Sequence, residues 1–236
     1  MNRSELKSLS KSQLKGYWKV PILLTLIYGL VVLGLWLTQN FFIAQPVAFL
    51  FLLLTLVIEI CATVGFPNFY LKFIKNREDT TLKDFFVSKT LLLKSLGYVL
   101  LMSLIGAIVG LIIGLILVSS MCYSMFAGDY LQPSWGIIVV ILLIGVLLTI
   151  FCLSVAMTTF ILVDKEGIGV FKAIGLSIKM MKGYKWKLFL LYLSFIGWAL
   201  LCILTLGIGY LWLAPYIYLT LTNFYKELDK IYQLKE

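Results

Sequence analysis

The sequence predicts an all-α integral membrane protein with about six transmembrane helices in three hairpins, each preceded by a cytoplasmic amphipathic interfacial helix. Hydrophobic residues make up 61% of the chain and charged residues only 13%, whereas a soluble domain carries about 25% charged residues. So few charges cannot cover a water-facing surface. The apolar residues also form runs close to the ~20 residues that a helix needs to cross the hydrocarbon core. We therefore expect one membrane domain over residues 1–236, surrounded mostly by lipid.

The six expected spans follow one another with polar links between them. The second span extends past Pro67, and the sixth is short and interrupted by Pro215. Residues 187–223 are barely long enough for the last two crossings. A tight turn through Gly207 and Gly209 has to join them, because glycine adopts turn geometry at low cost. The expected spans cover residues 21–38, 47–66 with an extension to 71, 95–119, 135–163, 188–206 and 209–222.

The basic residues indicate which side of the membrane each link occupies. All 20 Lys and Arg residues fall in four segments, and the other three links contain none. The positive-inside rule places such segments in the cytoplasm, so we expect both termini there and an even number of crossings. Because the cations flank apolar spans, the expected partners are anionic lipid headgroups and not nucleic acid. The basic segments are residues 3–19, 72–94, 165–187 and 226–235.

Three of the basic segments carry apolar residues at helical spacing. Residues 167–181 show this most clearly, with Phe171, Ile174, Ile178 and Met181 on one face. Such helices lie in the membrane interface with the apolar side down and the lysines toward the headgroups. The predicted interfacial segments are residues 3–15, 81–93 and 167–181, and an amphipathic tail follows at 223–236.

The entries to the first and last hairpins resemble each other beyond composition. One reads Leu14-Lys15-Gly16-Tyr17-Trp18-Lys19, the other Met181-Lys182-Gly183-Tyr184-Lys185-Trp186-Lys187, and a middle copy, Leu93-Lys94-Ser95, is degenerate. At such a corner Gly ends the surface helix in a left-handed conformation, while Trp, Tyr and Lys lie at the headgroup level. The pattern predicts three parallel repeat units, although any such corner could draw on these residue types. The expected units cover residues 1–71, 80–163 and 167–222. The expected lipid-headgroup residues are Lys15, Trp18, Lys19, Lys182, Tyr184, Lys185, Trp186 and Lys187.

Glu59 is the candidate functional residue inside a span. It lies in the second span, far from either charged flank, and no Lys or Arg lies within any span to pair with it. A charged side chain there costs at least about 2.5–3.5 kcal/mol. Three interpretations stay open: a neutral glutamic acid hydrogen-bonded between helices, a proton- or substrate-handling group in a wet cavity, or a residue outside the hydrocarbon core.

Gly106, Gly110 and Gly114 form a GxxxGxxxG stripe in the third span. Small residues four apart let a second helix backbone approach closely. The stripe therefore predicts a helix-packing face, against another span of the same chain or against another subunit.

The last hairpin contains the helix-breaking residues Gly207, Gly209 and Pro215. Transporters place substrate sites at broken helices, but a short kinked hairpin satisfied by neighbouring Ser and Thr explains these residues equally well. The nearby aromatic residues are predicted to form an interfacial belt. They are Tyr210, Trp212, Tyr216 and Tyr218.

No residue grouping predicts an enzyme, a metal site or a bound cofactor. The chain has no His, which removes the commonest general base and metal ligand. Its four Cys show no CxxC spacing, so neither zinc nor a redox pair is indicated. Asp164 and Glu166 lie in a Lys-rich link, where we expect them to be solvated or ion-paired. Walker and Rossmann motifs are missing from the sequence.

The corners and the last hairpin resemble the bacterial membrane-protein family catalogued as domain of unknown function 975. The likeness is strong at both ends of the chain and loose in the middle, where a longer polar loop and a long fourth span replace a Pro-Gly break. The resemblance implies a polytopic bacterial inner-membrane protein with no established activity, and it supplies no catalytic residues. The residues that carry it are Arg3-Ser4-Glu5-Leu6-Lys7, Leu14-Lys15-Gly16, Trp18, 181–189, 193–198, 204–209, Trp212, Pro215-Tyr216 and Asn223-Phe224-Tyr225.

Two functions agree with these features. The first is a non-enzymatic accessory or interaction protein, or one that protects the envelope, supported by the basic interfacial helices and the glycine stripe. The alternative is a transporter or flippase of a lipid or amphiphilic peptide, supported by Glu59 and the broken last hairpin. A membrane-protein partner or a homo-oligomer is compatible with both.

Overall fold

The computed structural model describes residues 2–41, 45–127, 135–165 and 167–234, and the regular structure in these ranges is entirely helical. The all-α prediction is therefore confirmed for the part of the chain that is described. The elements are α1 (Arg3–Leu14), α2 (Lys19–Phe41), α3 (Gln45–Lys75), the 3₁₀ turn η1 (Leu82–Phe85), α4 (Lys89–Ala127), α5 (Trp135–Val155), α6 (Thr158–Asp164), α7 (Val170–Met180), α8 (Lys185–Leu204) and α9 (Tyr210–Gln233).

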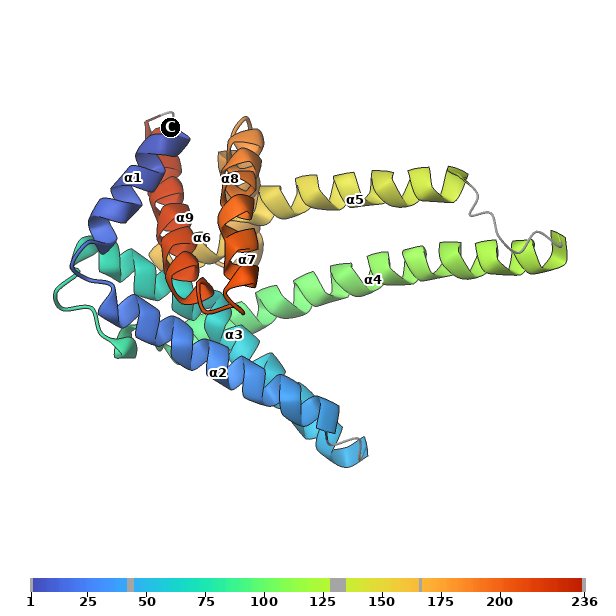
Figure 1. The fold of residues 1–236 in the computed structure, drawn as a ribbon. Coiled ribbons are helices and arrows are strands. Elements are labelled where there is room, and N and C mark those ends of the chain that lie inside the picture. The colour runs from blue at the N-terminus through green and yellow to red at the C-terminus, as the bar shows by residue number, and fades with distance from the viewer. Residues whose placement is uncertain (1, 42–44, 128–134, 166, 235–236) are drawn as a thin grey trace.

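Two long helical hairpins extend in different directions from a common base (Figure 1). Helices α2 and α3 form one of them, and Gln39 Nε2 donates a hydrogen bond of 3.0 Å to Thr55 Oγ1 between them. Helices α4 and α5 form the other. The base contains α1, α6, α7 and α9, while α8 packs on α9 and runs crosswise to α4 and α5 (Figure 1).

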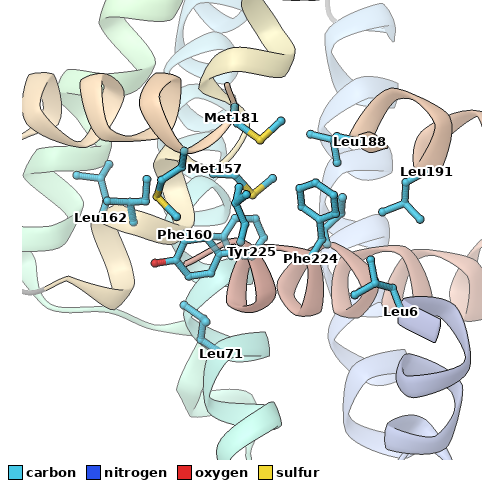
Figure 2. Close-up of a cluster of buried hydrophobic side chains, with 14 of the residues drawn as sticks. Leu6, Leu71, Met157, Phe160, Leu162, Met181, Leu188, Leu191, Phe224 and Tyr225 are labelled. Carbon is cyan, nitrogen blue, oxygen red and sulfur yellow. The ribbon is translucent and has the colours of Figure 1, made fainter. Parts of the chain in front are cut away.

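The base is built around the second half of α9, which is the most continuously buried stretch of the molecule. Phe224 and Tyr225 are at most 1% exposed, and the Tyr225 ring stacks on Phe160 of α6 at 5.4 Å between centroids. Figure 2 shows side chains from α1, α3, α6 and α8 gathered on this part of α9. They include Leu6, Leu71, Met157, Leu162, Leu188 and Leu191.

Polar contacts hold the same part of α9 in place. Asn223 Nδ2 donates to Ser10 Oγ at 2.9 Å and to Gln13 Oε1 at 2.7 Å, all within buried surroundings between α1 and α9. Lys226 pairs with Asp164 at 2.8 Å, and Lys165 pairs with Asp229 at 3.1 Å. Asp164 is thus ion-paired, as expected, whereas Glu166 lies outside the described residues. Residues 223–233 therefore continue α9 into the protein core, which corrects the prediction of a separate interfacial tail.

The two glycine corners have the same local geometry. Gly16 has a φ of +87° and Gly183 a φ of +86°, which confirms the left-handed conformation predicted for them. In each corner the following tyrosine N–H donates to the carbonyl three residues back, Tyr17 to Leu14 at 2.9 Å and Tyr184 to Met181 at 3.0 Å. Both of these preceding apolar residues are fully buried. Helices α1 and α7 thus enter their hairpins in the same way.

The middle corner is different, and the helix predicted over residues 81–93 does not form. Within this segment the chain makes η1, and residues 89–93 already belong to α4, which runs without a break through Ser95. Ser95 stands where the other corners have glycine, and a residue with a Cβ disfavours the left-handed conformation that would end a helix. A capping box precedes η1, where the Thr81 N–H donates to Asp84 Oδ2 at 2.8 Å.

Five of the described helical segments are long and apolar enough to cross a membrane. The sixth expected span, residues 209–222, forms the first part of α9, and the count of six is not confirmed. The predicted tight turn joins α8 to α9. Gly207 N–H donates to Cys202 O at 2.9 Å, and a Cβ on Gly209 would come within 2.9 Å of Cys202 Sγ. The qualifying segments are Lys19–Asn40, Phe49–Lys75, Lys89–Cys122, Trp135–Asp164 and Lys185–Leu204.

Replacing Gly183 by Ala should lower the free energy of unfolding by about 1–2 kcal/mol, the cost of placing a Cβ in the left-handed region. Thermal unfolding in detergent measures the difference. Gly175→Ala in α7 is the matched control, because its Cβ meets no atom within 4 Å and its backbone is right-handed. Equal melting temperatures of the Gly183→Ala variant and the parent would show that the corner does not require glycine at this position.

Candidate functional site

Glu59 lines a cavity of about 460 Å³ between the α2–α3 hairpin and the α8–α9 hairpin. This size falls in the usual range of ligand sites, about 300–1,000 Å³. On α3, the residues that line the cavity with Glu59 lie three, four, seven and eight positions further along, so they share one face of the helix. Helices α2, α6, α8 and α9 supply the remaining wall. The principal lining residues are Tyr28, Glu59, Thr63, Phe66, Thr159, Tyr192, Tyr210 and Tyr218.

An aromatic group centred on Phe66 forms one side of the cavity. The Phe66 ring stacks on Tyr218 of α9 at 4.7 Å between centroids and meets the edge of Tyr28 of α2 at 5.0 Å. Tyr218 also stacks on the fully buried Tyr70 at 5.7 Å. These rings join α2, α3 and α9, and they hold the Glu59 face of α3 toward the last hairpin.

Glu59 and Thr63 supply hydrogen-bonding groups on the α3 side of the cavity. Within the described residues, the Glu59 carboxylate has no ion pair or hydrogen bond, and its side chain is exposed. The Thr63 hydroxyl donates to the Glu59 carbonyl at 2.7 Å. Pro67 lacks an amide N–H, so the Thr63 carbonyl cannot receive the usual helical hydrogen bond from that residue. A carboxylate, several hydroxyls and a freed carbonyl therefore lie on the wall of one cavity.

This arrangement suits the binding of a ligand. Its polar groups are carboxylate, carbonyl and hydroxyl oxygens, which favour a ligand with hydrogen-bond donors or a positive charge. Tyrosine ring faces attract cations as well. No group of three or more Cys, Asp or Glu that could bind a metal occurs in the described ranges. The lining contains no nucleophile adjacent to a base.

The tyrosines were the part of the site that sequence reasoning missed. Tyr210 and Tyr218 were predicted to belong to an interfacial belt, and Tyr28 and Tyr192 were not singled out. The spacing of Glu59, Thr63 and Phe66 could have indicated a shared face on α3. Nothing in the sequence shows that this face meets α8 and α9.

The glycine stripe faces open space in the described structure. A Cβ on Gly106, Gly110 or Gly114 would meet no atom within 4 Å. No helix of the same chain therefore packs closely against these positions where the structure describes it. Packing of a helix against the stripe stays a prediction, and that helix is expected to come from a second protein.

The predicted headgroup residues lie at the two glycine corners, on the surface. Lys15, Lys19, Lys182 and Lys187 are exposed, and the Lys187 ammonium lies 5.2 Å from the centre of the Tyr184 ring. Trp18 and Lys185 are partly buried, and Trp186 is 66% exposed. In the last hairpin Gly207 has a φ of +86°, and Pro215 is accommodated inside α9 without ending it.

A family model described as "Protein of unknown function (DUF975)" matches residues 1–231. The match extends from α1 through most of α9 and agrees with the resemblance seen at the corners. Neither a curated protein nor a solved structure matches the chain.

Cysteine labelling tests whether the Glu59 cavity contains water. In a variant without the four native cysteines, Thr63→Cys should react with a hydrophilic maleimide, because the reactive thiolate forms only in a polar environment. Leu54→Cys is the control on the same helix, since its exposed side chain is expected to contact lipid and stay unreactive. Equal reactivity at both positions would contradict a separate wet cavity.

Proposed function

The chain belongs to the DUF975 family, and we propose that it is a polytopic bacterial inner-membrane protein that acts without enzymatic chemistry. Its role is that of an accessory or interaction protein, or of a protein that protects the envelope. The single observation that carries this proposal is the large apolar surface that the two long hairpins leave uncovered.

The α4–α5 hairpin presents this surface most clearly. Leu111 and Leu115 of α4 are more than 60% exposed, as are Leu142 and Leu147 of α5. Contiguous apolar surface of this extent marks contact with lipid or with another protein. The open glycine stripe lies on α4, and small residues of this kind allow close approach of a partner helix. A second membrane protein or a second copy of the chain fits this surface.

We place the base at the cytoplasmic face, because the Lys and Arg residues that the structure describes lie in or next to it and the positive-inside rule favours that side. Helices α2, α3, α4 and α5 then cross the membrane. The α8–α9 hairpin lies along the cytoplasmic interface, since α8 runs crosswise to α4 and α5 (Figure 1). The Lys7 ammonium of α1 also donates to the Ser194 carbonyl in the middle of α8, at 3.0 Å. Four crossings keep both termini in the cytoplasm.

The interaction role is tested by crosslinking and co-purification from native membranes, together with tolerance of cells to membrane-active agents. A partner or a tolerance phenotype should persist in Glu59→Gln and be lost when Gly106 and Gly110 are both replaced by Leu. The matched control is Gly145→Leu in α5, where a Cβ also meets open space. A monomer without partner or phenotype would contradict the proposal.

The Glu59 cavity favours transport of a lipid or amphiphilic peptide as a second candidate function. Transporters bind substrates in cavities between helices of separate structural units, and an ionisable residue within a span marks such sites. Helices from separate hairpins wall the cavity, so a change in the angle between them would open or close it.

In reconstituted vesicles, the protein should move a fluorescent lipid between leaflets, and Glu59→Gln should slow this movement. Glu5→Gln, on the exposed surface of α1, is the control for loss of one carboxylate and should leave the rate unchanged. Equal rates with and without protein would remove transport as a function.

A further inference from the structure

A second cavity, of about 360 Å³, lies between α1, the start of α2 and the turn end of the α8–α9 hairpin. We call it the tryptophan groove, after three of its lining residues. Its walls are almost entirely apolar, and α1 contributes the only charged side chain among the lining residues. The residues that define it are Lys11, Trp18, Trp198, Leu201, Trp212 and Leu213.

Specific contacts of α1 hold Lys11 at this groove. One turn earlier, the Lys7 ammonium donates to Ser194 O and lies 4.1 Å from the centre of the Phe195 ring. Burial lowers the pKa of Lys7, and the neighbouring Arg3 and Lys11 lower it further. On the next turn, Ser10 and Gln13 accept hydrogen bonds from Asn223. Lys11 lies between these anchors on the exposed side of α1.

Lys11 supplies the charged group of the groove, and no acidic side chain lines it. The lining hydroxyls make hydrogen bonds within the protein. The Thr205 hydroxyl donates to Cys202 O at 2.9 Å and accepts from the Gly209 N–H at 3.0 Å, and the Tyr216 hydroxyl donates to Lys7 O at 3.5 Å. The Lys11 ammonium is a hydrogen-bond donor only, so the group that it binds has to be an acceptor.

We propose that the tryptophan groove binds one acyl chain of an anionic phospholipid of the cytoplasmic leaflet, with the phosphate held by Lys11. The apolar walls match a hydrocarbon chain, and the Lys11 ammonium, with no acidic side chain beside it in the lining, matches a phosphate. Tryptophan is the side chain that membrane proteins place at the headgroup level. The site rests on the cytoplasmic placement of α1 and the α8–α9 hairpin proposed above.

Quenching of tryptophan fluorescence by brominated lipid tests this site. Trp36, Trp135 and Trp186 are replaced by Phe, so that only the three groove tryptophans remain in the chain. The full-length protein is reconstituted in zwitterionic vesicles containing a small fraction of either brominated phosphatidylglycerol or brominated phosphatidylcholine. At low salt the anionic lipid should quench at about fivefold lower mole fraction, from its attraction to one lysine.

The Lys11→Gln variant should lose this preference, whereas Lys75→Gln, which removes an exposed lysine at the end of α3, should keep it. If the Lys11→Gln variant does not fold, the protein that keeps Lys11 is measured at higher ionic strength, which should weaken its preference for the anionic lipid. Equal quenching by the two lipids, or a preference insensitive to both Lys11 and salt, would overturn the proposal.

Sidedness is measured separately, by labelling Ser8→Cys on the exposed face of α1 in intact and opened cells. Labelling only in opened cells, together with unselective quenching, would overturn the lipid site and leave the proposed topology standing. Labelling in intact cells would overturn the topology and, with it, the assignment of this lipid.

Discussion

The rest of the structure depends on the burial of the second half of α9. Phe224 and Tyr225 are surrounded by side chains from α1, α3, α6 and α8, so this one helix holds together segments from both ends of the sequence. Buried polar groups have to find partners, and Asn223 does so with Ser10 and Gln13 of α1. Ion pairs of Lys226 with Asp164 and of Asp229 with Lys165 attach the end of α6 to the same helix.

A packed base of this kind leaves the long hairpins free to diverge. Because the base determines their directions, α2–α3 and α4–α5 do not pack along their lengths as a closed bundle would (Figure 1). The space beside α3 becomes the Glu59 cavity, with Phe66 and Tyr218 stacked at its wall. The exposed sides of α4 and α5 become surfaces for lipid or a partner.

The two cavities have opposite chemical preferences. Glu59 supplies an acidic side chain to one cavity, whereas the tryptophan groove is lined by Lys11 and by no acidic side chain. They lie on different sides of the α8–α9 hairpin, which contributes Tyr192, Tyr210 and Tyr218 to one and Trp198 and Trp212 to the other. A lipid bound in the groove would therefore contact the same two helices that line the Glu59 cavity.

Composition by itself predicted the helical class, and glycine placement predicted the left-handed corners at Gly16 and Gly183. The resemblance of the corners and the last hairpin indicated the family. These properties depend on local conformation and on the cost of exposing apolar residues to water. The tertiary structure alone decided that residues 223–233 belong to the core, that Ser95 does not break α4, and that four tyrosines surround Glu59. An amphipathic pattern shows that a helix has an apolar side. It does not show whether lipid or another helix covers that side, because both are equally apolar.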